Sequence, residues 1–148
     1  MPRKSLSVLL LLGALSGCHE PIGPVVPSGL FVLERVSGES VPVLAYVDAT
    51  YRYIRVADSL VVRGDGNGEQ ATVQRVERID GTSTPNTVTW RVPIRFDRAN
   101  GTIRFGRGCP INASCAVADP VPVTISAGGL AFTIDGGRHE YRSAAPAP

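Results

Sequence analysis

The clearest hydrophobic pattern in this chain lies in the stretch VTWRVPIRF, residues 88–96. Five apolar residues alternate there with polar residues and one proline, and they are Val88, Trp90, Val92, Ile94 and Phe96. A period of two places alternate side chains on opposite faces, so the stretch predicts a half-buried β-strand. Because proline donates no backbone hydrogen bond, Pro93 is expected at a sheet edge or a bulge.

A second apolar alternation follows at once in GTIRFG, residues 101–106, where Ile103 and Phe105 share one face. The Asn100-Gly101 pair between the two runs is typical of a tight hairpin turn. The sequence therefore predicts that these two runs pair as a β-hairpin.

Short extended runs fill most of the remaining chain, separated by turn-forming residues. The runs are GLFVLERV, VPVLAYV, YRYIRV, SLVVRG, ATVQRVERI, VPVTIS, GLAFTI and RHEYR. The glycine-rich segments between them, such as RGDGNGEQ, have the chemistry of turns. No stretch of eleven or more residues has a helical period. About eight to ten short strands predict an all-β fold, an antiparallel meander that forms a small barrel or sandwich.

The beginning of the chain has the order of a secretory signal: positive charge, apolar run, small residues. Arg3 and Lys4 come first, the apolar run Leu6–Leu15 is too short to span a bilayer, and Ser16-Gly17 precede Cys18. The stretch Leu15-Ser16-Gly17-Cys18 resembles the lipobox of bacterial lipoproteins. An ordinary signal followed by a free or disulfide-bonded Cys18 is the alternative interpretation.

The lipoprotein resemblance implies that residues 1–17 are a removed signal peptide and that Cys18 carries the lipid, with acyl chains such as palmitate. Two or three acyl chains suffice for stable membrane anchoring. His19 stands where an Asp would imply retention on the inner membrane, so the resemblance implies the outer membrane, at its periplasmic face or at the cell surface. Residues 18–28 are rich in proline and are expected to form a semi-rigid spacer.

Charge and length limit the functions open to the rest of the chain. The full chain has 15 basic and 13 acidic residues, and two of the basic residues are Arg3 and Lys4. The part after residue 17 is therefore close to neutral, which argues against a nucleic-acid partner. We expect one β-barrel domain at 29–142 and a disordered tail at 143–148.

Two further cysteines, Cys109 and Cys115, lie in GCPINASC. Export would place them where disulfides persist, so a structural disulfide is the favoured interpretation over free thiols or a metal site. A metal site would need more ligands than the sequence places nearby. We predict no metal and no cofactor.

The segments SGLFVLERVSGESVPV and SLVVRGDGNGEQ, with the meander around them, resemble small lipocalin-like bacterial lipoproteins over residues 28–142. This resemblance implies a lipocalin-like barrel and, as one possible function, the transport of a small hydrophobic ligand.

Candidate chemistry is sparse in the β domain. His139 lies near Asp135, Glu140 and Tyr141, but no Gly-x-Ser-x-Gly elbow accompanies it, so a solvated or hydrogen-bonded histidine is favoured over a catalytic one. The acidic and amide residues of DGNGEQ (Asp65, Asn67 and Glu69) alternate like calcium ligands but lack the remaining EF-hand spacing, which favours a plain hairpin turn.

Aromatic residues give the best indication of a binding surface. Tyr46, Tyr51 and Tyr53 gather near Arg52 and Arg55 in the sequence, and Trp90 is the single tryptophan. Binding surfaces concentrate such side chains, although ordinary strands contain them too. We therefore regard the three tyrosines and Trp90 as candidate ligand-binding residues.

The hypothesis that best fits these features is a non-catalytic, lipid-anchored protein of the cell envelope that binds an envelope protein or helps to organise the envelope. The alternative is a carrier of a small apolar ligand inside the barrel. A hydrolytic enzyme that uses His139 is the third and weakest hypothesis.

Overall fold

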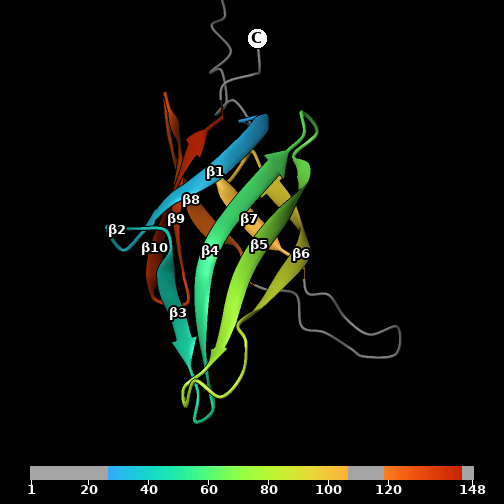
Figure 1. Ribbon diagram of the computed structural model, residues 1–148. Helices are drawn as coiled ribbons and strands as arrows, with labels where there is room; N and C mark the ends of the chain where they lie inside the picture. The colour runs from blue at the N-terminus through green and yellow to red at the C-terminus, as the bar shows by residue number, and fades with distance from the viewer. Residues whose placement is uncertain (1–26, 107–118, 145–148) are drawn as a thin grey trace, which may run out of the picture.

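The computed structural model describes residues 27–106 and 119–144, and in these residues it contains ten β-strands and no helix (Figure 1). The strands are β1 Gly29–Val36, β2 Glu39–Ser40, β3 Val43–Val47, β4 Tyr51–Val62, β5 Asn67–Arg78, β6 Asn86–Asp97, β7 Thr102–Phe105, β8 Val121–Ser126, β9 Gly129–Ile134 and β10 Gly137–Ser143. In this part of the chain no helix is long and apolar enough to cross a membrane. Cys18, Cys109 and Cys115 lie outside the described residues.

Eight of the strands close into an antiparallel barrel. From β4 to β10 each strand pairs with the next, and β1 lies between β10 and β4, antiparallel to both. The strands β2 and β3 are additions to this barrel. The predicted fold class is confirmed, in the form of a closed lipocalin-like barrel rather than a sandwich. Closure pairs the backbones of β1 and β4, which would otherwise be sheet edges.

The hairpin predicted from residues 88–105 is present as β6 and β7. Its turn is a four-residue loop from Arg98 to Gly101, so Asn100-Gly101 forms the end of the loop rather than a two-residue turn. Asp97 holds the loop, because its carboxylate accepts the Ala99 N–H at 3.0 Å and the Asn100 side-chain amide at 2.8 Å.

Two runs that looked separate in the sequence, YRYIRV and SLVVRG, form the single twelve-residue strand β4. The pairing of β4 with β5 shifts register between Arg55 and Ala57, which is a β-bulge. The bulge interrupts the alternation and explains why the sequence suggested two strands. At the other end of the chain, β10 extends to Ser143, one residue past the predicted domain boundary.

The barrel interior is filled by apolar side chains from most of the strands. The buried cluster contains Phe31, Leu33, Leu60, Val62, Ile94, Phe96, Ile103, Phe105, Leu130, Phe132 and Tyr141. Phe132 lies at its centre, with ring centroids 5.3 Å from those of both Phe105 and Tyr141. Burial of a large apolar side chain contributes about 1.5–3 kcal/mol, so this cluster supplies much of the driving force for folding.

The two ends of the barrel differ. Phe31 pairs with Ser143, so β1 begins and β10 finishes at one end, which we call the N-terminal end. The β3–β4 and β9–β10 turns lie at the opposite end, which we call the far end. There β3, β4 and β5 continue beyond the β9–β10 turn, at the bottom of Figure 1.

Candidate functional site

A four-stranded sheet projects from the barrel at the far end. It exists because β4, β5 and β6 have twelve residues each, whereas β7 pairs with β6 only over Ile94–Asp97 and β1 pairs with β4 only over Ser59–Val62. The remainder of the long strands, joined by β3, forms what we call the extension, which comprises residues 43–47, 51–57, 73–78 and 86–92.

Pro93 marks the point where β6 leaves the barrel. Its carbonyl accepts the N–H of Gly106 at 2.7 Å, just after the last residue of β7. In an antiparallel strand the N–H and C=O of one residue point to the same side, so the donor that proline lacks would face β7. As predicted, Pro93 lies where an edge begins: within residues 27–106 and 119–144, no strand pairs with β6 on this side before Pro93.

One face of the extension continues the interior face of the barrel. Trp90 is the cross-strand partner of Thr72, whose hydroxyl donates a hydrogen bond to the buried Asp58. Cross-strand partners share a face, so Trp90 belongs to the interior face although its side chain is 59% exposed. The same alternation assigns further residues to this inner face: Tyr46, Tyr51, Tyr53, Val76 and Val88.

The three tyrosines form a cluster on the inner face. The Tyr53 ring lies 5.7 Å from that of Tyr46 and 6.5 Å from that of Tyr51. In the β3–β4 turn, the Asp48 carboxylate accepts the N–H groups of Thr50 and Tyr51 at 2.7 and 2.6 Å and the Tyr53 hydroxyl at 3.2 Å. The structure thus brings the predicted tyrosines together and places Trp90 on the same face, two strands from Tyr53.

Arg55 and His139 lie between the extension and the barrel interior. Arg55 Nη1 lies 3.3 Å from Nδ1 and 3.1 Å from Nε2 of the His139 ring. His139 is buried, and burial together with the positive charge of Arg55 lowers its pKa to about 4. The His139 ring is therefore neutral and accepts a hydrogen bond from Arg55. Of the two non-catalytic interpretations of His139, solvated or hydrogen-bonded, the structure agrees with the second.

Behind this pair lies a buried polar cluster that the sequence analysis did not identify. Asp58 is 1% exposed, and it accepts hydrogen bonds from Gln70 Nε2 at 2.9 Å, Thr72 Oγ1 at 2.7 Å and the Tyr141 hydroxyl at 3.0 Å. Burial raises the pKa of Asp58, although these donors act against the shift. The sequence does contain a signal for the burial of Asp58, because Asp58 is in phase with the apolar residues Leu60 and Val62.

A cavity of about 290 Å³ opens beside Arg55 and His139. Apolar side chains of Val36, Val43 and Ile134 line it, together with the β9–β10 turn at Asp135 and Gly136. The volume is close to the lower limit of ligand pockets. This cavity and the inner face of the extension are neighbours, because Arg55 pairs with Val43 and Tyr53 pairs with Tyr46 along the same two strands.

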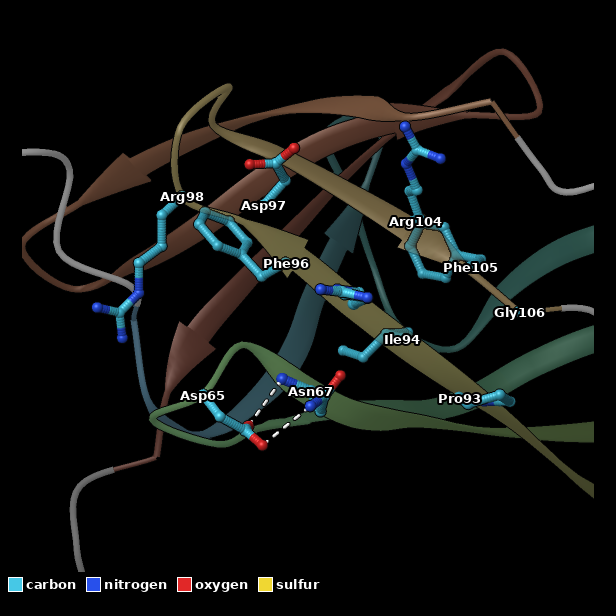
Figure 2. Close-up of a pocket in the computed structure, with 11 residues that line it drawn as sticks. Asp65, Asn67, Pro93, Ile94, Phe96, Asp97, Arg98, Arg104, Phe105 and Gly106 are labelled. Carbon is cyan, nitrogen blue, oxygen red and sulfur yellow. Dashed lines mark hydrogen bonds between the residues drawn. The ribbon is translucent and has the colours of Figure 1, made fainter.

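A larger cavity of about 720 Å³ lies over β5, β6 and β7 (Figure 2). Its polar lining includes Arg95, Arg98 and Arg104, and the first and last of these are direct cross-strand partners. The side chains of Arg95 and Arg104 point away from the core, since their strand neighbours Ile94, Phe96 and Phe105 are buried in it. Arg98 donates a hydrogen bond to the carbonyl of Gly64.

The residues that resembled a calcium loop form an ordinary hairpin turn, as expected. Asp65 accepts the backbone and side-chain N–H groups of Asn67, both at 2.9 Å, which Figure 2 shows as dashed lines. Glu69 forms an ion pair with Arg91 on the outer face. Over residues 27–106 and 119–144, no three acidic, histidine or cysteine side chains are grouped to hold a metal ion.

Comparisons of this chain with protein-family models, with curated proteins and with solved structures found no match. The functional conclusions therefore depend on the residues and on the geometry described above.

Proposed function

We propose that this chain is a lipid-anchored protein of the cell envelope, without catalytic activity, whose barrel binds a partner protein on the inner face of the extension. The lipobox-like stretch at residues 15–18 supports the anchor. The observation that carries the binding role is the aromatic inner face, where Tyr46 and Trp90 are about 60% exposed although they continue a face that is buried elsewhere.

Tyrosine and tryptophan are the residues that protein interfaces concentrate, because they contribute a large contact area at a small cost in side-chain entropy. Backbone pairing holds the extension, because β4 pairs with β5 along its whole length apart from the bulge between Arg55 and Ala57. Ion pairs on the outer face, from Glu77 to Arg52 and Arg75, support the same strands. A rigid sheet with exposed aromatic side chains needs little reorganisation to bind a partner.

The arrangement of the two ends also favours this function. A tether at Cys18 would reach the barrel at its N-terminal end, where β1 begins, so the extension would point away from the membrane. The spacer at residues 18–28 would reach roughly 30 Å if it is extended. That distance would leave the far end accessible to another protein of the envelope.

Site-specific photo-crosslinking in cells tests the binding role. A photoreactive residue at Tyr46 should give one reproducible adduct, whereas the same residue at Val47, the exposed neighbour on the outer face, should give none. The Trp90→Ala substitution should abolish the adduct from position 46. Equal crosslinking from both positions, or an adduct that Trp90→Ala leaves unchanged, would refute the proposal. The intact mass of protein extracted from membranes tests lipidation of Cys18 separately.

A further inference from the structure

We propose that the cavity beside Arg55 and His139 is a binding site for a carboxylate attached to a short apolar group. This site depends on its own geometry and goes beyond the proposed function: it would stand if the aromatic face bound nothing and if Cys18 carried no lipid.

The guanidinium of Arg55 is short of acceptors. It has five N–H donors, and its described side-chain contact is the His139 ring, which in the neutral form offers a single acceptor nitrogen. The Nε atom of Arg55 is buried without a hydrogen-bond partner. Among the described residues Arg55 forms no ion pair, because the buried Asp58 attracts its charge without touching it. A charged, partly buried group therefore has no anion in direct contact.

The neighbouring acidic residues do not fill this role. Asp58 lies deeper in the barrel, and its two oxygens accept hydrogen bonds from Gln70, Thr72 and Tyr141. Asp135 lies at the rim of the cavity in the exposed β9–β10 turn. Arg55 therefore has unused donors beside an open cavity, and a carboxylate is a ligand whose two oxygens fit a guanidinium.

The rest of the cavity fits a short apolar group. Val36, Val43 and Ile134 form apolar walls, and about 290 Å³ accommodates a carboxylate with a few methylenes or one apolar side chain. His139 acts here as a positioning residue, because its ring accepts from Arg55 and lies 5.7 Å from the ring of Phe132 in the packed core. A free monocarboxylate and the carboxyl terminus of a polypeptide with an apolar last residue share this chemistry.

Titration of the purified protein with hexanoate, followed by NMR, tests the site. Hexanoate should bind saturably, whereas hexanol and hexylamine should not, because they lack the carboxylate. Arg55→Gln should weaken hexanoate binding about tenfold or more, and Arg91→Gln, which removes an exposed arginine on the outer face, should leave it unchanged. The comparison of hexanoate with hexanol on the unsubstituted protein keeps the test valid if Arg55→Gln fails to fold.

The peptide N-acetyl-Ala-Leu-Leu, as the free acid and as the C-terminal amide, distinguishes the two sources of the carboxylate. Binding of the free acid alone, without binding of hexanoate, would assign the site to a polypeptide terminus. Binding of hexanoate would assign it to a small monocarboxylate. If neither acid binds at concentrations up to tens of millimolar, or if Arg55→Gln binds them as well as the unsubstituted protein does, the proposal is wrong.

Discussion

The closed barrel and the extension share strands and a continuous face, yet their side chains have opposite environments. On β6, Ile94 is 3% exposed and Trp90 is 59% exposed, although both lie on the interior face. The difference arises because β7 pairs with β6 only from Ile94 onward. A hydrophobic alternation thus determines which face a side chain occupies, but neighbouring strands determine whether that face is covered.

This difference separates the two energetic roles of apolar residues. In the closed barrel, aromatic rings pack against one another and are removed from water, which stabilises the fold. On the extension, similar residues remain exposed to water and contribute little to the stability of the fold. Exposed apolar patches of this kind commonly mark interaction sites, where a partner would remove them from water. Three predictions test this division, and they follow in order of decreasing effect on stability.

The largest effect is expected at Phe132, which contacts rings from β7 and β10 in the centre of the barrel. Phe132→Ala should reduce the free energy of unfolding by about 3–5 kcal/mol, because it removes buried surface and leaves a cavity. Trp90→Ala, a larger truncation, should change it by less than about 1 kcal/mol. Urea denaturation of the purified protein measures both. A large loss for Trp90→Ala would show that the inner face of the extension is covered in solution.

An intermediate effect is expected from the protonation of His139. Its pKa falls from 6.5 in the unfolded chain to about 4, so the unfolded state binds the extra proton first. The stability that neutral His139 contributes is present above pH 6.5 and is lost as the pH falls toward 4, by roughly 3 kcal/mol in total. Arg55 favours this shift and Asp135 opposes it.

Asp58 changes in the opposite sense, because its raised pKa makes the folded state lose stability as the pH rises through that pKa. His139→Gln should therefore flatten the loss of stability between pH 6.5 and 4 and reveal the opposite slope of Asp58. Urea denaturation at a series of pH values measures both slopes. An unchanged pH dependence in His139→Gln would mean that the pKa of His139 is not lowered in the folded protein.

The fold could be predicted because its strands are local and repetitive. Residues 88–105 contain their own alternation and turn, and they form β6 and β7 where expected. The extent of β4 was harder to predict, because a bulge between Arg55 and Ala57 breaks the alternation. Only its pairing with β5 shows that the strand is continuous. Closure of the barrel by β1 against β4 joins residues about thirty positions apart, for which the sequence has no local signal.

The candidate site could be predicted in part. The tyrosines lie close together in sequence, so their clustering on β3 and β4 required only a hairpin. The Arg55–His139 contact joins β4 to β10, and the Asp58 cluster joins three strands, so both depend on closure of the barrel. Asp58 was detectable as a polar residue in phase with Leu60 and Val62, but its partners were not.

The smallest effect is expected on the outer face, where Glu69 and Arg91 form an exposed ion pair across β5 and β6. Glu69→Gln should change the free energy of unfolding by less than about 0.5 kcal/mol, because water screens the pair and ordering two long side chains offsets the attraction. It should also leave the adduct from position 46 unchanged, since its side chain lies on the face opposite to the tyrosines. If Glu69→Gln weakened the adduct as strongly as Trp90→Ala, binding would depend on the charges of the outer face rather than on the aromatic inner face.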